Sequence, residues 1–496
     1  MNNVTEWASW SKYRDRESLT VDLPRGGDCP CAFFFPADYK VGMANLGFHY
    51  IYRVLRELGV SAERFFTSPA PYRSVERDTL LERFPVVLGS ISYEAGVSEF
   101  ARWLAGGNIQ PSRRLRRDVL VGAGGAVTYI NPLSLSAICD FIVLGDGIET
   151  ARFMVGILRG GLPKENMLAA LAEHPSIYVP SIHEHGRHCL YNARDGIARG
   201  YGRGTWTTPL AAFGNTLLLE LQRGCMRRCR FCAIAYCFGC SETRDLNLVK
   251  RDIEEANALC DFSQIGLVTP EAGDYRELDA LLELVEHIGK GVSFASLRIE
   301  GLNERMARAL TSAGRKNLTI APESGDDELR ERCGKRFTNG DLIEKLKMSE
   351  ECGARGVKMY FMFGLPGETD GQLLSISKLC ARVTEETGLA VTAAVSPFIP
   401  KPGTPWAEEV FDGERKLKHK YSLISKSFGM PGVKLQCGSI KEACLEYAIS
   451  WADANTSELI ANTSARGISY RKLGGLTDKG IFYTELERLG LRGSKN

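Results

Sequence analysis

Short apolar runs alternate with helical stretches through the first third of the chain, and this alternation limits the possible folds more than any other pattern. The runs have the length of strands, and in chain order they are Cys31–Asp38, Glu63–Thr67, Pro85–Ser92, Asp118–Gly122 and Phe141–Gly145. Between them, apolar residues recur every three or four positions, as over Met43–Leu58 and Val97–Leu104, which indicates amphipathic helices. Buried strands joined by helices pair in parallel, so the pattern predicts an α/β fold that begins with a doubly wound parallel sheet.

The turns after these strands are rich in glycine and small polar residues. In chain order they carry Asp38, Ser90–Tyr93, Gly122–Gly125 and Gly145–Gly147. Ligands of doubly wound sheets lie across the carboxyl ends of the strands. A single glycine cluster is most simply a tight turn, whereas several along one edge of the sheet predict a ligand cleft.

Composition narrows the class of protein. The 496 residues are 44% hydrophobic and 25% charged, the balance of a globular protein of several domains. Lys and Arg number 62 against 60 Asp and Glu, and this formal net charge of +2 argues against general nucleic-acid binding. No apolar run is long enough to span a membrane, and the first residues lack the pattern of a signal peptide. We therefore expect a cytoplasmic protein whose 15 cysteines are reduced thiols, some of them in a metal site.

The stretch after the first domain, which we assign to residues 1–165, loses the alternating pattern. Residues 166–209 are rich in Pro, Gly, His and charged side chains, which favours a linker or hairpin. A metal site at the H-x-H pair of His183 and His185 is the alternative. A group of arginines earlier in the chain predicts a solvated face, with RNA binding as its alternative; these are Arg113, Arg114, Arg116 and Arg117.

A cysteine motif follows the apolar strand at Thr216–Glu220. Cys225, Cys229 and Cys232 have the spacing C-x3-C-x2-C within one loop. Three thiolates are too few for a closed structural zinc site, which takes four ligands. They suit three corners of a [4Fe–4S] cluster whose fourth iron stays open to a ligand from outside the protein.

This loop, with the aromatic Phe231 before its last cysteine, is similar to the cluster loop of the radical S-adenosylmethionine (SAM) superfamily. After it come further strand-length runs, at Ile265–Thr269, Val292–Leu297, Leu318–Ala321, Val357–Phe363 and Ala390–Ser396. With the first strand they make six β/α units, which resemble the partial (β/α)6 barrel of that superfamily. The resemblance implies a barrel over residues 210–420, followed by a small helical C-terminal region over 421–496 that caps it.

Three later segments resemble SAM-binding positions of the superfamily. In Ala321–Thr338 the resemblance implies that Glu323 and Ser324 meet the SAM ribose and that Lys335 or Arg336 reaches its carboxylate. Met359–Thr369 is similar to the glycine motif near the adenine, which implies contacts from Gly364, Pro366 and Gly367. Ser396–Trp406 resembles the proline-rich sixth-strand end of cobalamin-type and methylthio-type members.

The first domain resembles the cobalamin-binding-like domain of B12-type radical SAM proteins, over Phe33–Leu55 and Val121–Thr150. The residues that fall close to its glycine motifs are Gly124, Gly125, Thr128, Gly145, Asp146, Gly147 and Glu149. The D-x-H-x2-G signature of an axial histidine is absent, and His49 lies on the first helix outside that context. Either cobalamin binds without a protein histidine, its lower face meeting Ser90, Tyr93 and their neighbours as far as Glu94, or the domain is scaffold only.

The resemblance implies that the cluster and SAM generate a substrate radical, most simply for cobalamin-dependent methylation of carbon. A cobalamin-independent cyclase, desaturase or rearranging enzyme and a non-catalytic Fe–S sensor are the alternatives. The implied partners are a small-molecule or peptide substrate and an electron donor such as flavodoxin or ferredoxin, which the arginines around the cluster loop could dock. The remaining cysteines are predicted to be buried and inert, although Cys237 and Cys240 could build a second cluster with Cys437 and Cys444 or donate sulfur.

Overall fold

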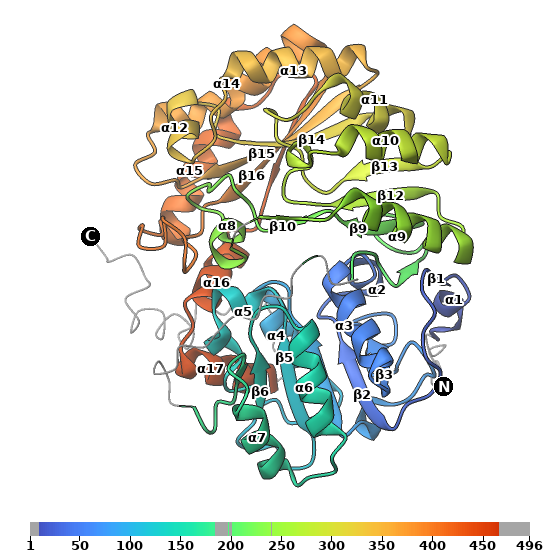
Figure 1. Ribbon diagram of the computed structural model, residues 1–496. Helices are drawn as coiled ribbons and strands as arrows, with labels where there is room; N and C mark the ends of the chain where they lie inside the picture. The colour runs from blue at the N-terminus through green and yellow to red at the C-terminus, as the bar shows by residue number, and fades with distance from the viewer. Residues whose placement is uncertain (1–8, 184–196, 198–200, 240, 466–496) are drawn as a thin grey trace, which may run out of the picture. The chain divides into compact units, whose positions relative to one another are not determined.

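The computed structural model describes residues 9–183, 197, 201–239 and 241–465. These residues form two compact units, each with its own parallel sheet (Figure 1). The first unit contains residues 9–218, 252–262 and 449–465, and the second contains 219–251 and 263–448. Within the described part of the chain, no helix has the length and apolar character that crossing a membrane requires.

The first unit is built on a six-stranded sheet with the order β3-β2-β4-β5-β6-β7. Its strands are β2 (Cys29–Phe34), β3 (Val60–Phe65), β4 (Val86–Ser90), β5 (Leu120–Gly124), β6 (Phe141–Val143) and β7 (Ile177–Tyr178). The first five are parallel and β7 is antiparallel to β6. The predicted doubly wound sheet is confirmed: the chain leaves the edge strand β3 and crosses to β4 on the other side of β2, so the switch point lies between the ends of β2 and β4.

Amphipathic helices connect these strands. They are α2 (Tyr39–Gly42), α3 (Leu46–Glu57), α4 (Ala95–Gly106), α5 (Val127–Ile130), α6 (Ile148–Leu158) and α7 (Lys164–Ala172). Helix α3 begins at Asn45, whose side chain accepts a hydrogen bond from the backbone N–H of Phe48. The ring of Phe48 then stacks on Phe33 of β2 with 4.6 Å between centroids, which fixes α3 on the sheet. Figure 1 shows α3 and α6 side by side over the strands.

Part of the segment assigned to a linker belongs to this sheet instead. Helix α7 begins just before residue 166, and β7 extends the sheet at Ile177–Tyr178. The ring nitrogens of His174 and His183 accept hydrogen bonds from the backbone N–H groups of Ser176 and Val179, so both histidines hold turns. The other member of the H-x-H pair, residue 185, lies outside the described residues. The sequence did not predict this edge strand, because two residues are too few to show the alternation of apolar and polar side chains that indicates a strand.

The arginine group before β5 is not uniformly solvated. Arg116 is buried and bonds Asp140 at 3.0 Å and the carbonyl of Ile138 at 2.7 Å. Arg113 donates to the carbonyls of Ser136 and Pro180. The predicted solvated face is therefore wrong for these two residues, whose donors satisfy carbonyls that the turns leave unpaired.

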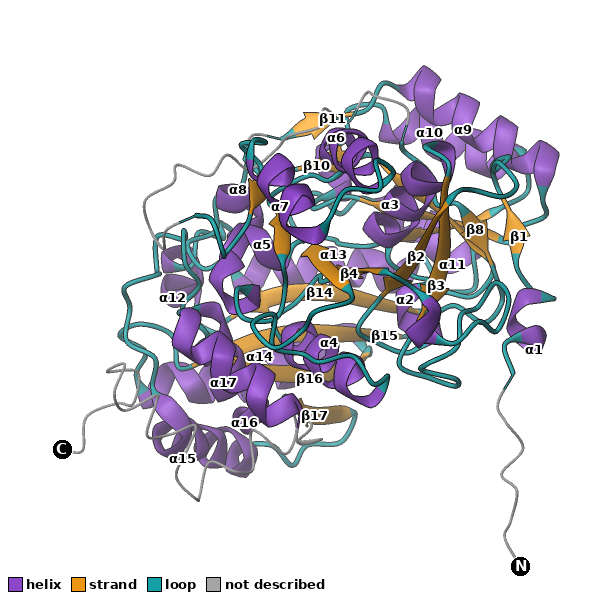
Figure 2. Ribbon diagram, turned by 90° about the horizontal axis from the view of Figure 1, so that it is seen from below, coloured by secondary structure: helices purple, strands orange, loops and turns teal. Residues whose placement is uncertain are grey.

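The second unit is a partial barrel of parallel strands. Its strands are β9 (Thr216–Glu220), β12 (Gln264–Val268), β13 (Gly291–Phe294), β14 (Asn317–Glu323), β15 (Gly356–Phe363), β16 (Ala390–Pro397) and β17 (Val433–Cys437). They form a three-stranded sheet, β13-β12-β9, and a four-stranded sheet, β14-β15-β16-β17, whose strands run side by side in Figure 2. The six predicted strands are present, and β17 adds a seventh beyond residue 420.

Helices follow the barrel strands in turn. They are α8 (Ala233–Cys237), α9 (Leu246–Leu259), α10 (Leu278–His287), α11 (Glu304–Ser312), α12 (Asp327–Arg332), α13 (Asn339–Glu351), α14 (Asp370–Thr387), α15 (Gly413–Ser427) and α16 (Ile440–Ser450). Capping boxes at Thr338 and Thr369 start α13 and α14. On β15, Met359 and Phe361 are buried whereas Tyr360 between them is exposed, so the strand alternates between a packed face and an open one.

The C-terminal region is helical, as predicted, and its last described helix belongs to the first unit. Helix α17 (Ala454–Ala465) packs in the first unit, against α4. The hydroxyl of Ser457 donates to the carbonyl of Ser134 and accepts from the backbone N–H of Ala137, both at 2.9 Å. The predicted division at residue 420 therefore differs from the structure on both sides: β17 continues the barrel, and α17 returns to the first sheet.

Candidate cluster and cofactor sites

The three cysteines of the motif lie in the loop between β9 and α8. Gly224 and Arg228 have positive φ angles of 75° and 50°, and these two turns wind the loop tightly. Cys229 is buried, while Cys225 and Cys232 are half-buried. The backbone N–H of Cys232 donates to the carbonyl of Cys229 at 3.1 Å. The loop therefore presents its thiols from one short segment, as the sequence predicts.

Two backbone hydrogen bonds anchor this loop to the rest of the barrel. The N–H of Arg230 donates to the carbonyl of Cys333, and the N–H of Trp406 donates to the carbonyl of Arg230. Gly334 approaches the loop so closely that a side-chain carbon there would lie 3.1 Å from the Cα of Cys229. The glycine in the C-G-K segment is thus required by packing on the cysteine loop.

The surroundings of the loop disfavour ionisation of the free thiols. Burial raises the pKa values of Cys225 and Cys232, and the charge of Cys229 raises both further. Thiols that disfavour one another's ionisation in this way become stable thiolates when they coordinate iron. Among the described residues no three His, Cys, Asp or Glu side chains have the spacing of ligands to a single ion. A four-iron cube takes each thiolate on a different iron, so its ligands stand further apart than those of one ion.

Arg298, which the sequence reasoning missed, contacts the loop from the segment after β13. Its Nη1 donates to Sγ of Cys229 at 3.2 Å and its Nη2 to Oε1 of Glu300 at 2.7 Å. The only signal in the sequence is an arginine just beyond a predicted strand, at the carboxyl end where barrel strands present functional side chains.

Glu323 closes β14 in a strained conformation beside the cysteines. Its φ angle is +68°, which is uncommon for a residue with a side chain, and the ladder to β15 shifts register between Ile320 and Glu323. Its carboxylate accepts a hydrogen bond from Nζ of Lys335 at 2.7 Å, and Lys335 also donates to the carbonyl of Ala321. Arg336 is exposed. Of the two basic candidates, the structure therefore joins Lys335 to Glu323.

Ser324 and the segment after it form a braced turn. The hydroxyl of Ser324 accepts from the backbone N–H of Asp326, and its carbonyl accepts from Nη2 of Arg330 at 2.7 Å. Arg330 is fully buried and also donates to the carbonyls of Pro322 and Phe337. Ser324 thus serves the turn that positions Glu323.

The glycine motif after β15 is held from two sides. Gly364 and Gly367 have φ angles of 83° and 65°, and the N–H of Gly364 donates to Oε2 of Glu368 at 2.7 Å. Arg332 of α12 donates to the carbonyl of Pro366. Burial raises the pKa of Glu368 to about 7. The strand ends of β14 and β15 are therefore locked together near the cysteine loop.

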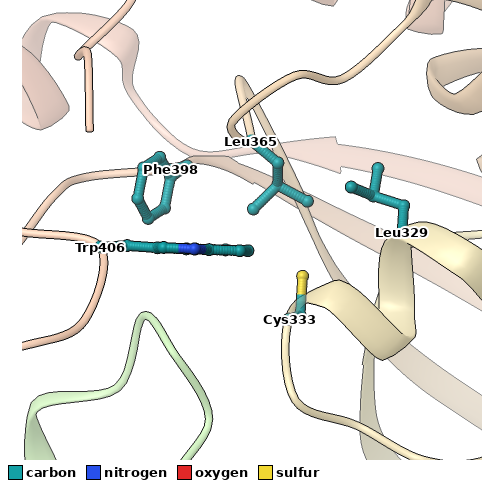
Figure 3. Packing of buried hydrophobic residues seen from close by; sticks show 5 residues of the cluster. All are labelled: Leu329, Cys333, Leu365, Phe398 and Trp406. Carbon is teal, nitrogen blue, oxygen red and sulfur yellow. The ribbon is translucent and has the colours of Figure 1, made fainter.

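An apolar cluster seals these strand ends. Its buried members are Leu329, Cys333, Leu365, Phe398 and Trp406, and Phe231 of the cysteine loop packs against it. Figure 3 shows the leucine and cysteine side chains converging on the indole of Trp406, which Phe398 meets edge-on at 5.6 Å. The aromatic position of the motif thus packs against this apolar cluster, beside a loop in which Cys225 and Cys232 stay half-buried.

The glycines of the first unit are brought together at the carboxyl ends of β5 and β6. The hydroxyl of Thr128 donates to the carbonyl of Gly125 at 2.8 Å and accepts from the N–H of Gly145 at 3.4 Å. A side-chain carbon on Gly125 would lie 2.5 Å from the carbonyl oxygen of Ile91, and one on Gly147 would lie 2.9 Å from Cδ1 of Ile51. Close packing within the domain therefore accounts for both glycines.

The predicted residues on β4 lie at the switch point. Ser90 ends β4 opposite Gly124 and is buried. The hydroxyl of Tyr93 donates to the carbonyl of Pro36 at 3.0 Å, which ties the turn after β4 to the turn after β2. Glu94 is buried and accepts a hydrogen bond from Ser450 at 2.9 Å. Ser92, Tyr93, Gly124–Ala126 and Tyr129 are half-exposed along these strand ends, and together they form the rim of the sheet.

His49 is excluded as a ligand at that edge. It is fully buried in α3, its Nδ1 accepts from the backbone N–H of Thr205 at 3.1 Å, and its ring meets Trp206 edge-on at 5.1 Å. Burial, with the nearby charge of Arg64, lowers the pKa of His49 to about 3. It is a neutral core histidine, as its position on the first helix suggested.

The other cysteines are packing residues where the structure describes them. Cys29 and Cys31 are buried in β2, and Cys237 and Cys444 are buried as well. Burial raises the pKa values of all four thiols. Cys437, at the end of β17, is half-buried, and Cys240, the fourth residue of the predicted second cluster, lies outside the described residues.

Comparison with known proteins assigns both units. The model of the radical SAM superfamily matches residues 219–380, and a model of the N-terminal part of radical SAM proteins matches residues 47–180. The chain belongs to the radical SAM superfamily. Membership implies a [4Fe–4S] cluster and SAM as cofactors, and the three thiols beside Glu323 and Lys335 fit that pair.

The fold is that of the B12-type radical SAM proteins. The methyltransferase TsrM from Kitasatospora setae, solved with cobalamin and a [4Fe–4S] cluster, superposes with a TM-score of 0.56 at 14% identity over 88% of this chain and 99% of that one. The cobalamin-dependent SAM radical enzyme OxsB, solved with aqua-cobalamin and SAM, gives a TM-score of 0.51 at 15% identity over 88% of this chain and 61% of that one.

Two curated relatives illustrate the matches in sequence. Protein MJ0966 of Methanocaldococcus jannaschii, described as uncharacterized, is 26% identical over 466 residues, 91% of this chain and 97% of that protein. The tRNA-2-methylthio-N(6)-dimethylallyladenosine synthase of a Wolbachia species is 26% identical over 43% of this chain, which spans about half (51%) of that enzyme.

Proposed function

We propose that this radical SAM protein is a cobalamin-dependent methyltransferase that acts on a carbon atom. The observation that carries the proposal is the combination, in one chain, of the cysteine loop with a doubly wound domain that presents a half-exposed rim at its switch point. Similarity to TsrM over 88% of the chain supports it, since TsrM is described as a methyltransferase and was solved with cobalamin.

Different residues of the barrel would bind the iron–sulfur cluster and SAM. Cys225, Cys229 and Cys232 would hold the cluster, and Lys335 would offer its ammonium to the SAM carboxylate while Glu323 accepts from the ribose hydroxyls. When bound, the cluster supplies one electron to SAM and cobalamin supplies a transferable methyl group. The apolar cluster around Trp406 keeps water from the strand ends, where a substrate radical would otherwise be lost.

The first unit would bind cobalamin without an imidazole ligand. His49 has its Nδ1 bonded to Thr205 within the core, so it does not reach the strand ends. The half-exposed Tyr93, tethered to Pro36, is the side chain best placed on β4 to meet a ligand face. Cobalamin binding in this mode would depend on the half-exposed residues of the rim.

A second candidate is a radical SAM enzyme that works without cobalamin. It is favoured because the residues of the cobalamin-like motifs already make packing contacts and hydrogen bonds within the first unit. Gly125 packs on the backbone of Ile91, Glu94 bonds Ser450, and Asn131 donates to the carbonyl of Ala452 at 2.7 Å. A domain whose strand ends are closed by its own C-terminal segment could serve as scaffold alone.

The two candidates are separated by measurements that need no known substrate. Anaerobically reconstituted protein should cleave SAM to 5′-deoxyadenosine under reducing conditions, which a sensor would not do. Absorbance titration should show uptake of hydroxocobalamin, and Ala126→Trp on the half-exposed rim should abolish it while Leu162→Trp on the exposed surface should not. SAM cleavage without cobalamin uptake would establish the second candidate, and S-adenosylhomocysteine formed with substrate would establish methylation.

We also propose that an acidic one-electron donor docks at the cluster loop. Met226, Arg228 and Arg230 are exposed around the half-buried Cys225, and a short path to the cluster favours electron entry there. Arg228→Glu with Arg230→Glu should slow SAM cleavage at least tenfold with flavodoxin as donor but leave the rate with dithionite unchanged. Equal rates with both donors would remove the loop as the docking surface.

A further inference from the structure

Arg298 is an unusual neighbour for a cysteine. Its side chain is 11% exposed. One N–H group of its guanidinium donates to Sγ of Cys229 at 3.2 Å, although carboxylates lie nearby. A neutral thiol is a weak acceptor, so a hydrogen bond to it would stabilise a half-buried arginine only slightly. A thiolate is a charged acceptor, and the bond to it is correspondingly strong. Arg298 would therefore be a strong hydrogen-bond donor to Cys229 once that thiolate is bound to iron.

The carboxylate of Glu300 holds the guanidinium in this orientation, and the carboxyl group of Glu271, whose pKa burial raises to about 7, lies nearby. Glu300 accepts from Nη2 at 2.7 Å, and Oε2 of Glu271 lies 4.0 Å from Nε. Although burial opposes ionisation, the hydrogen bond from Arg298 brings the pKa of Glu300 below its ordinary value. Glu271 is 1% exposed. Since the carboxylates lie on the side of the guanidinium away from Nη1, they leave that donor for the cysteine.

Arg298 differs in this respect from Arg227, which lies within the cysteine loop. Arg227 supplies only its backbone N–H to Sγ of Cys225, at 3.5 Å, while its guanidinium pairs with Asp274. Its side chain is 36% exposed, against 11% for Arg298. One of the three motif thiols therefore receives a side-chain hydrogen bond from a buried cation, and this asymmetry follows from the placement of Glu300 and Glu271 on one side of the site.

We propose that Arg298 is a positioning residue that fixes Cys229 as a cluster ligand and raises the reduction potential of the cluster. Hydrogen bonds to ligand sulfurs and nearby positive charge stabilise the reduced cluster, which carries one more negative charge than the oxidised one. Because the bond is shielded from water, its effect is larger than that of an exposed arginine at similar distance. The inference rests on the cluster of the proposed function.

The test compares three variants of the full chain after anaerobic reconstitution. In each, iron content is measured first, and the reduced cluster is then followed by electron paramagnetic resonance during a redox titration. Arg298→Gln should retain about four irons per chain. At the wild-type midpoint its ratio of reduced to oxidised cluster should fall about tenfold, a shift of about 59 mV for a one-electron couple. Arg227→Gln, the matched control, should shift the ratio less than twofold.

Glu300→Gln is expected to shift the reduction potential in the opposite direction from Arg298→Gln, and it leaves Arg298 in place. The amide oxygen can still accept from Nη2, but a negative charge is gone, so the potential should rise. If Arg298→Gln fails to load iron, this variant decides the question. An unchanged or lower potential in Glu300→Gln would overturn the proposal, as would equal shifts for Arg298→Gln and Arg227→Gln.

Two other outcomes are separable from these. An Arg298→Gln variant with the wild-type potential but SAM affinity reduced tenfold would make Arg298 a SAM contact and refute the role proposed for it. Wild-type protein that takes up no iron would instead contradict the proposed function itself, before any variant is compared.

Discussion

The buried pair of Glu323 and Lys335 allows a quantitative test of how the SAM segment is held. Their side chains are only 10% and 8% exposed, and Nζ and Oε1 are 2.7 Å apart. Removing one partner from such a pair leaves an uncompensated charge in the interior, which costs about 3–5 kcal/mol. Lys335→Met should therefore lower the free energy of local opening around the end of β14 by about 3–5 kcal/mol, since Met fills similar volume but cannot neutralise the carboxylate.

The assay is native-state amide hydrogen exchange, because it reports local opening of β14 without requiring two-state unfolding of a chain with two units. The double variant Glu323→Gln, Lys335→Met removes both charges and should return to within about 1.5 kcal/mol of the wild type. Lys347→Met is the control: its partner Glu386 is 36% exposed, so the change should be below about 0.5 kcal/mol.

The same variants separate stability from binding. The double variant should keep the cluster yet bind SAM at least about tenfold more weakly, because it loses both the charge-assisted hydrogen bond to the ribose and the ammonium offered to the SAM carboxylate. Protection of β14 in Lys335→Met within about 1 kcal/mol of the wild type would refute the argument, since it would mean that water already screens the pair. Unchanged SAM affinity in the double variant would leave Glu323 as a turn residue only.

Three further predictions follow from the sites. Changing Cys225, Cys229 and Cys232 to Ala should abolish both iron uptake and SAM cleavage, and a triple variant that keeps about four irons per chain would disprove the ligand set. Protein loaded with cobalamin and reduced to cobalt(II) should show no nitrogen superhyperfine splitting in its electron paramagnetic resonance spectrum, because His49 is buried in the core. Such splitting would reveal an axial nitrogen ligand and contradict this binding mode. Burial raises the pKa of Glu368 to about 7, so the folded state binds this proton more tightly than the unfolded state, and its contribution to stability is lost as the pH rises towards 7. Glu368→Gln should therefore flatten the fall in denaturation midpoint between about pH 4.5 and about pH 7, and an unchanged pH profile would show that Lys420 compensates the charge.

Local pattern was sufficient for the strands and the cysteine motif. The periodicity of two in β15 and of three to four in α3 is set by backbone geometry, so it is legible without knowing what each face packs against. The spacing of Cys225, Cys229 and Cys232 is likewise local, because one loop supplies all three ligands. The resemblance to the radical SAM superfamily was carried by such continuous segments.

Contacts between distant segments were beyond the reach of sequence alone. The choice of Lys335 over Arg336 depends on which side chain points inward after the turn that Arg330 braces, and the role of Arg298 depends on Cys229, 69 residues away in the chain. The burial of Arg116 against Asp140 and the return of α17 to the first unit have the same origin. Hydrophobic periodicity states that an element has a buried face, but only tertiary packing selects the partner that buries it and the ionic groups that are buried with it.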